Sequence, residues 1–149
     1  MNEDRISITE DLMVEALKSA LPDTKVEPRT SPLTEEELKK ILGAAPFVFL
    51  EYNGGNRMSS LENGSTSVRR NVFNLFVAAK SLRSKQEAQR GSYSLLSAIF
   101  ETLDGATLKD DEYPDRFAGP FTWESEAIFF DSIGGTIYQA VYSVTETAQ

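Results

Sequence analysis

The sequence predicts an α+β fold, an antiparallel β-sheet with helices packed mainly on one face. Helical and strand-like patterns follow one another in the order helix, short extension, helix, two strands, helix, two strands. The last two strands are joined by "SIGG", whose glycine pair is typical of a hairpin turn. The 149 residues, 40% hydrophobic and 26% charged, suit one domain. We expect it to span 1–149, with a helical N-terminal part over 1–45 and the sheet with its central helix over 46–149.

The first expected helix is "EDLMVEALKSAL", with Thr9 as its N-cap. Met13 and Leu17 are part of an apolar set at helical spacing, and the helix should stop before Pro22. The following "TKVEPRTSP" is a short extended segment whose prolines exclude a central strand.

A second helix is expected over residues 35–42, "EEELKKIL". Thr34 takes the N-cap position and Glu37 the capping-box position three residues later. Gly43 is placed to end this helix.

Two strand signals and a loop signal follow. "PFVFLEYN", Pro46 to Asn53, is an aromatic and β-branched run typical of a strand. Gly54 to Ser67 is rich in Gly, Ser and Asn, which fits either a functional loop or a flexible excursion. "VRRNVFNLFVAAKS", Val68 to Ser81, carries apolar groups on both alternating faces. Such a strand is either central in its own sheet or covered by a helix on one face and a second subunit on the other.

A third helix is expected in "QRGSYSLLSAIFETLDG", Gln89 to Gly105. One broad arc of its helical wheel is apolar, which predicts packing on the sheet, although a surface for a partner is the alternative. That arc contains Leu95, Leu96, Ile99, Phe100 and Leu103. Gly91 and Ser92 lie at the same side and would let the first turn approach the sheet closely, and Gly105 supplies the left-handed C-terminal position.

The remaining strands are "PFTWESEAIFFD" and "TIYQAVYSVTET", with the Gly134 and Gly135 pair at the turn. Trp123 is an anchor either of the core or of an interface, and its indole N–H needs a partner in both cases.

Charge is distributed unevenly along the chain. The formal net charge is −8, yet residues 57–90 hold two acids against seven bases, and 91–149 hold ten acids against two bases. These segments are either ordinary solvated faces, or a basic face of one copy that meets an acidic face of the next in a ring or filament. The acidic total argues against general nucleic-acid binding.

Composition removes several kinds of chemistry. Without cysteine there is no disulfide, thiolate nucleophile or zinc-thiolate site, and without histidine the commonest general base and metal ligand are missing. "SYSLLS" offers serines without a histidine or an SxxK partner. Neither a signal peptide nor a membrane-spanning run is recognisable, so we expect assembly in the cytoplasm and no membrane partner.

Carboxylates are the remaining candidates for an active site. "DDE" at 110–112 falls in an expected turn, and Glu124 and Glu126 are expected on the same face of a strand. Either set could bind a cation weakly. Acids that alternate along a strand are usually its wet face, so we expect no enzyme, no catalytic or metal-binding residue and no cofactor.

The second half of the chain resembles a family of small tail and neck proteins of Mu-like tailed bacteriophages. In that family an "F.V.V" strand leads through Arg and Gly into a "G.Y.LL..I...L.G..L" helix, and a "Y.A.Y.V" strand closes the chain. The matching positions here are Phe73, Leu75, Val77, Arg90, Gly91, Tyr93, Leu95, Leu96, Ile99, Leu103, Gly105, Leu108, Tyr138, Ala140, Tyr142 and Val144.

The resemblance implies a tail terminator or tail-completion protein of the virion tail or neck. Such a protein forms a ring, expected to be a homohexamer, that caps the tail tube, stops polymerisation and presents a surface to the head. Its implied partners are other copies of itself, the tube and sheath proteins, a head-completion or connector protein, and DNA only as it passes through the lumen. The alternatives are a neck or head-completion adaptor, or a binding module unrelated to phages.

Six residues are candidates for the interface. We expect the bases to meet acids of an adjacent subunit or of the tube, so that salt weakens assembly. The candidates are Arg69, Arg70, Arg83, Lys85, Glu124 and Glu126.

Overall fold

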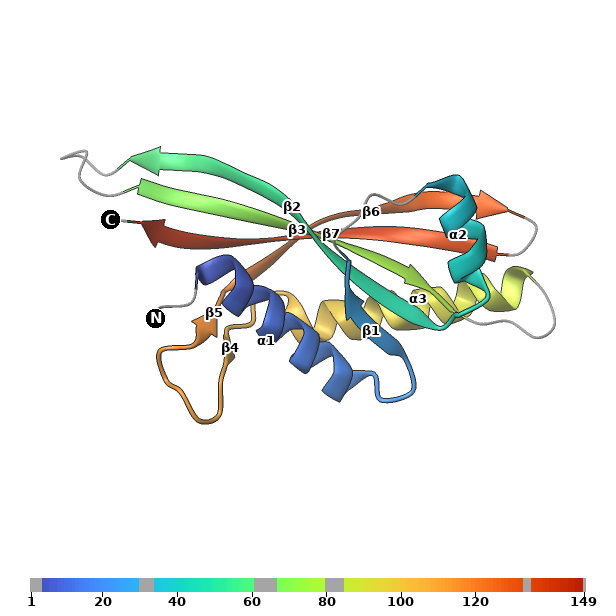
Figure 1. The fold of residues 1–149 in the computed structure, drawn as a ribbon, viewed down its shortest axis with the longest axis horizontal. Helices are drawn as coiled ribbons and strands as arrows, with labels where there is room; N and C mark the ends of the chain where they lie inside the picture. Colours follow the sequence, from blue (N-terminus) through green and yellow to red (C-terminus); the bar gives the residue numbers. More distant parts are fainter. Residues whose placement is uncertain (1–3, 30–33, 61–66, 80–84, 133–134, 149) are drawn as a thin grey trace.

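The computed structural model describes residues 4–29, 34–60, 67–79, 85–132 and 135–148 (Figure 1). A five-stranded sheet runs along the long axis of the molecule and is covered by helices. The elements are α1 (Arg5–Ala20), β1 (Lys25–Pro28), α2 (Glu35–Leu42), β2 (Phe47–Ser60), β3 (Ser67–Ala78), α3 (Lys85–Leu103), β4 (Leu108–Lys109), β5 (Phe117–Ala118), β6 (Phe121–Ser132) and β7 (Gly135–Ala148).

The large sheet has the strand order β1-β2-β3-β7-β6. Its neighbours pair antiparallel except for β1, which lies parallel to β2. The predicted α+β class is confirmed, with a sheet that is mixed because the short proline-containing segment joins it at one border. Strand β3 lies in the centre, and every residue from Asn71 to Ala78 is buried, as its two apolar faces predict.

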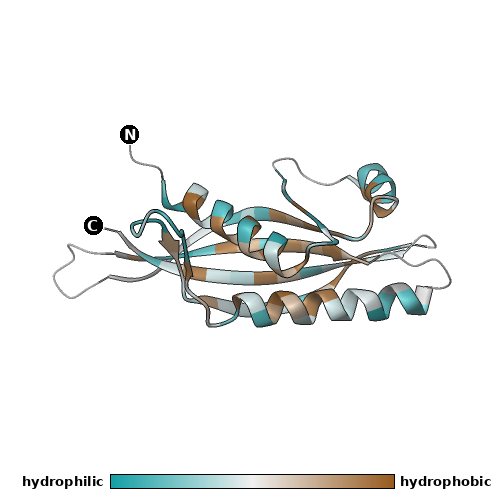
Figure 2. Ribbon diagram, turned by 90° about the horizontal axis from the view of Figure 1, so that it is seen from below, coloured by the Kyte–Doolittle hydropathy of each residue, from teal (hydrophilic) through white to brown (hydrophobic). Residues whose placement is uncertain are grey.

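Two helices cover one face of the sheet. α1 and α3 lie beside each other along it (Figure 2). Leu12, Met13 and Leu17 of α1 share one hydrophobic cluster with Ile99 of α3 and Phe73 of β3. This cluster is the main core of the protein.

In the part of the chain that the structure describes, the opposite face is covered only at one end, by α2. Leu38 of this helix packs with Phe47, Phe76 and Ile137 in a second, smaller cluster. The predicted placement of the helices mainly on one face is therefore confirmed.

The first helix begins earlier than expected. Asp4 is its N-cap, because its carboxylate accepts hydrogen bonds from the Ser7 backbone N–H at 2.7 Å and the Ser7 hydroxyl at 2.9 Å. Thr9, expected as the cap, is buried inside the helix and donates its hydroxyl proton to the Arg5 carbonyl oxygen at 2.7 Å. The second helix matches its prediction, with the Glu37 N–H donating to Thr34 Oγ1 at 3.2 Å.

Strand β2 is longer than the sequence suggested, since it continues through Gly54 and Gly55 to Ser60. The register shifts between Tyr52 and Gly55, so a bulge absorbs the glycine pair. A Cβ atom on Gly55 would lie 2.9 Å from Asn71 Oδ1, which explains glycine at this position. The expected loop is thus wrong for 54–60 and for Ser67, which begins β3, and 61–66 lie outside the described residues, as do 80–81 and Gly134.

Candidate interaction surfaces

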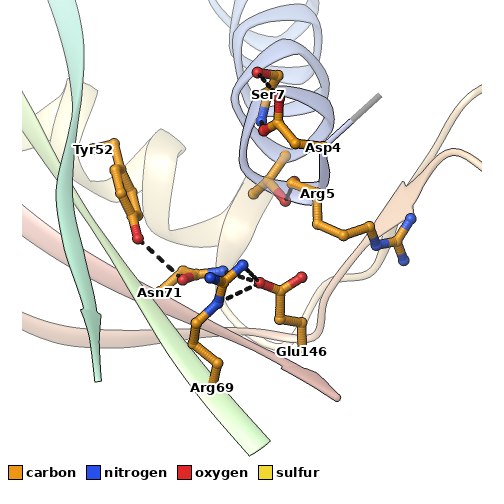
Figure 3. Close-up of polar contacts among 8 residues, drawn as sticks. Asp4, Arg5, Ser7, Tyr52, Arg69, Asn71 and Glu146 are labelled. Atoms are coloured by element: carbon orange, nitrogen blue, oxygen red, sulfur yellow. Dashed lines mark hydrogen bonds and ion pairs between the residues drawn. The ribbon is translucent and has the colours of Figure 1, made fainter. Parts of the chain in front are cut away.

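A polar cluster joins β2, β3 and β7 beyond the start of α1 (Figure 3). Arg69 and Glu146 are cross-strand neighbours, and the guanidinium donates through Nε at 2.6 Å and through Nη2 to one carboxylate oxygen. Asn71 Nδ2 donates to the same oxygen at 3.0 Å, and Tyr52 donates its hydroxyl proton to Asn71 Oδ1 at 3.3 Å. Arg69, expected at an interface with another chain, therefore holds an acid of its own chain.

A cavity of about 340 Å³ lies next to this cluster. Arg5 forms part of its wall and stacks its guanidinium on the Phe117 ring, 4.5 Å from the centroid, while Nη1 donates to the Asp115 carbonyl oxygen at 3.2 Å. Asn71 and Glu146, which also line it, are partners of each other. The polar groups around this cavity hold the strands together, and no charge among them points to a ligand.

Arg70 and Glu124 form an ion pair on the opposite face of the sheet. Their closest atoms, Nη2 and Oε1, are 2.7 Å apart, and Ser143 donates its hydroxyl proton to the same oxygen at 2.6 Å. The Ser143 hydrogen bond, followed by those from Arg70, holds the pKa of Glu124 below its ordinary value of 4.5. Arg70, like Arg69, meets an acid within the chain.

Glu126 lies on the other face from Glu124, so the expectation that both acids share a face is wrong. Trp123 pairs with Tyr142 and Ser125 pairs with Val141, which leaves Glu124 as the extra residue of a bulge. The bulge shifts the alternation by one residue. Glu126 accepts a hydrogen bond from Trp123 Nε1 at 3.1 Å, which supplies the partner that the indole N–H was expected to need.

Two bases remain among the interface candidates, and α3 begins at one of them, four residues before the expected start of the third helix at Gln89. Lys85 is the first residue of α3. Arg83 lies outside the described residues.

An open groove of about 590 Å³ lies between α3 and β6. We call it the α3/β6 groove, and it is lined by Tyr93, Leu96, Ser97, Phe100, Glu101, Trp123 and Glu126. Phe100 was predicted to face the core, yet its side chain is 42% exposed, because it faces the groove between α3 and β6. There its ring packs edge-on against the ring of Trp123, with the two ring centroids 6.3 Å apart. Trp123 is 39% exposed, and Ile128 further along β6 is 58% exposed. Exposed apolar groups gathered in this way mark an interaction surface.

Tyr93, which lines the groove, packs against a buried tyrosine of the sheet. Tyr93 of α3 and Tyr138 of β7 contact each other with ring centroids 5.8 Å apart. Burial, with the neighbouring Tyr93, raises the pKa of Tyr138 to about 12. Tyr138 therefore carries a neutral hydroxyl group, and not a charge, at neutral pH.

The acidic segment at 110–112 has a structural role. Asp110 Oδ1 accepts hydrogen bonds from the backbone N–H groups of Glu112 and Tyr113 at 2.9 and 3.1 Å, and Oδ2 accepts one from Arg116 Nε at 3.1 Å. The hydrogen bond from the Glu112 backbone N–H lowers the pKa of Asp110 most, and the bonds from Tyr113 and Arg116 lower it further. Asp110 thus shapes the turn between β4 and β5.

Within the described ranges, no group of three His, Cys, Asp or Glu side chains is arranged to hold a metal ion. Among the helices of that same part of the chain, none has the length and apolar character needed to cross a bilayer.

Sequence reasoning missed the α3/β6 groove. Helical spacing assigned Phe100 to the buried arc, because a wheel does not show where the sheet beneath the helix ends. A usable signal was present in "AIFF", where Ile128, Phe129 and Phe130 follow one another without alternation. Of these three, Ile128 and Phe129 are exposed.

The fold and these surfaces define an α+β protein with an exposed apolar groove beside a border strand, an arrangement typical of chains that associate with others. Among solved structures it is similar to a chain from the "Virion of native gene transfer agent (GTA) particle". The two align over 99% of this chain and 100% of that chain, with a TM-score of 0.54 and 10% identity. At that identity the similarity is one of fold. No family model and no curated protein matches the sequence.

Proposed function

We propose that this protein is a structural component of a virion, a tail terminator that caps a phage tail tube as a ring. It would stop polymerisation of the tube and give the head a surface to join. The observation that carries the proposal is the shared fold, over its full length, with a chain of a virion particle. The resemblance of its sequence motifs to the Mu-like tail family narrows the role to the tail.

Those motifs occupy one continuous part of the structure. Phe73, Leu75 and Val77 of β3 lie in the main core with Ile99 of α3 and Tyr142 of β7. The pattern is thus that of a helix packed on two adjacent central strands. Because the motif residues lie in the core, they support a resemblance in fold to the Mu-like tail family. The argument for assembly rests instead on the exposed surfaces.

The proposed role needs no chemistry, only a surface that joins copies in a ring and faces for the tube and the head. The α3/β6 groove is an exposed apolar surface of this kind. Arg69 and Arg70 keep 43% and 30% of their side-chain surface exposed while they hold Glu146 and Glu124. They remain proposed interface residues together with Arg83 and Lys85, and with Glu124 and Glu126 as acidic counterparts.

The test is the mass of the purified chain by light scattering, alone and with tail tubes of a Mu-like phage, at low and at high salt. A closed ring alone, or a mass gain only with tubes, supports the terminator. A strict monomer that ignores tubes in every condition contradicts it. Binding to a head connector instead of tubes would assign the protein to the neck.

Charge reversal tests the basic interface without disturbing the described ion pairs. Arg83→Glu combined with Lys85→Glu should lower the tube-bound fraction and its sensitivity to salt. The control reverses two exposed lysines elsewhere, Lys18→Glu with Lys40→Glu, and changes the net charge equally. If both double variants lose the same tube-bound fraction, the effect is one of net charge, and Arg83 and Lys85 are not interface residues.

A further inference from the structure

We propose that the α3/β6 groove binds a short apolar segment of a partner protein that carries arginine or lysine. The apolar side chains of the segment would cover the aromatic residues of the groove, and its bases would meet the acids around them. The inference rests on the proposed function, for which it supplies a contact with another virion protein. Its test uses the isolated chain, so it can fail while the proposed ring stands.

The groove has the length of a short peptide segment. Its helical wall runs along α3 from Tyr93 to Glu101, and the helix rises about 12 Å over this distance. β6 forms the other wall with Trp123 and Glu126. A length of about 12 Å corresponds to about three or four residues of an extended chain. The shape therefore suits a peptide segment that lies along the groove.

Aromatic side chains supply the apolar part of the surface. Tyr93 at one end of the groove is 51% exposed, and Phe100 and Trp123 contact each other at the other end. Ile128 pairs with Tyr138, which Tyr93 contacts, so this exposed side chain extends the apolar surface beyond Tyr93. Large aromatic groups of this kind contribute strongly to binding, because they bury much apolar area with few rotatable bonds.

Acids surround Trp123, and among the described residues no base lines the groove. Glu126 accepts a hydrogen bond from the indole Nε1 at 3.1 Å, and Asp104 Oδ1 accepts one from the Trp123 backbone N–H at 2.9 Å. Glu101 is exposed on the helical wall, and none of the described bases pairs with it. Arg90, the last base of α3, lies about three turns before Glu101, towards the other end of the groove.

The effect of these acids reaches the core. Tyr142 is the cross-strand neighbour of Trp123 and is fully buried. Burial raises the pKa of its hydroxyl group, and the negative charges of Glu126 and Asp104 raise it further. The groove beside Trp123 is thus a region of negative potential, which favours a base in its occupant.

Carboxylates beside aromatic rings are surroundings that a guanidinium or ammonium group prefers. The cation is attracted to the ring faces and forms charge-assisted hydrogen bonds with the carboxylates. An acidic segment would be repelled, and a polar segment would leave the aromatic side chains in water. The same groove of a second copy would bring acids against acids. The chemistry therefore selects a segment in which bases stand among apolar residues.

Trp123 is the one tryptophan of the chain, so its fluorescence reports occupation of the groove. The probe is the peptide acetyl-Leu-Arg-Leu-Leu-Arg-Leu-amide, titrated into the purified chain. We expect a saturable shift of the emission to shorter wavelength, with a Kd that rises with salt. Two comparison peptides replace either every arginine by glutamate or every leucine by serine. Each should bind several-fold more weakly.

Variants locate the binding. Glu101→Gln should raise the Kd of the arginine peptide several-fold and leave the melting temperature unchanged, because Glu101 is exposed. Glu36→Gln, which removes the same charge from an exposed position of α2, is the control and should leave the Kd unchanged. Phe100→Ala tests the apolar contact and should also raise the Kd several-fold. Its control is Tyr113→Ala, which removes an exposed aromatic ring from the turn between β4 and β5.

Three results overturn the inference. Equal affinity for the arginine peptide and either comparison peptide would show that the groove does not select bases among apolar residues. Equal weakening by Glu101→Gln and Glu36→Gln would reduce the effect to net charge. An emission shift on concentrating the chain without peptide, with a rise in mass, would make a second copy the occupant. Light scattering with tail tubes is a separate measurement, so a failure of the proposed function is recognised independently.

Discussion

A Cβ atom on Gly91 would lie 2.8 Å from the Cβ atom of Ala79, so the first half of α3 rests directly against the end of β3. The next residue completes the contact, because the Ala79 N–H donates to Ser92 Oγ at 3.2 Å and Ser92 is buried. Glycine followed by serine therefore fixes how closely the helix approaches the sheet, as the sequence predicted.

Gly91→Val should destabilise the fold. The new side chain overpacks the contact with Ala79, which typically costs about 1–3 kcal/mol. Thermal unfolding followed by circular dichroism should show a midpoint lower by several degrees. Ser94→Val, on the exposed side of the same helix, is the control and should change the midpoint little. Equal shifts in both variants would contradict the close approach as the cause.

Glu146→Gln should weaken the polar cluster of β2, β3 and β7. The Glu146 side chain is only 15% exposed and accepts from Arg69 and Asn71, and hydrogen bonds to a charged group contribute about 1.5–3 kcal/mol. Urea unfolding should show a loss near the lower end of that range, since Arg69 can turn to water. In an Arg69→Gln background the same change should cost less. Independent, additive losses would show that the pair is not coupled.

Acid should destabilise the protein partly through Glu124. Its pKa is lower in the folded state than its ordinary 4.5, so its stabilisation is full above that value and is lost as pH falls through the folded pKa. Melting temperatures measured from pH about 6 to about 3 should fall less steeply in Glu124→Gln than in the natural chain. Glu36→Gln, which removes an exposed acid of α2, is the control variant. An unaltered slope in Glu124→Gln would contradict the role of the Ser143 and Arg70 contacts.

Ile128→Lys should impair assembly and leave folding intact. Ile128 is 58% exposed on β6, so a lysine costs the isolated chain less than about 0.5 kcal/mol, yet it places a charge among the exposed apolar side chains that are proposed to take part in assembly. Light scattering with tail tubes should show a reduced bound mass at an unchanged melting temperature. Tyr113→Lys, 60% exposed at the turn between β4 and β5, is the control. Undiminished tube binding by Ile128→Lys would show that this exposed side chain of β6 takes no part in assembly.

Local signals allowed much of the fold to be predicted from sequence. The second helix is set by Thr34 and its neighbours, and its bounds are confirmed. The first helix was placed too late because Asp4 is an equally good cap further upstream, and it joins Ser7 in a local hydrogen-bonded pair. β2 was placed too short because glycine has low strand propensity, whereas pairing with β3 through a bulge holds the segment in the sheet.

The surfaces depend on features that alternation alone does not reveal. One inserted residue at Glu124 sends it and Glu126 to different faces, and only the cross-strand register shows the insertion. The many bases in residues 57–90 marked Arg69 and Arg70 as interface candidates. The sequence did not indicate their partners within the chain, Glu146 and Glu124, because these lie far away along it. Pairing across such distances is a property of the topology.

The place of β7 between β3 and β6 has a consequence for the nascent chain. When β3 leaves the ribosome, β2 is available on one side of it, but β7, its neighbour on the other side, is made only after α3, β4, β5 and β6. Until β7 arrives, the hairpin of β2 and β3 exposes an open edge and two apolar faces, which favours aggregation. The two halves of the sheet can join only when translation reaches Gly135–Ala148, so a chaperone that holds the chain during this interval would raise the yield of folded protein.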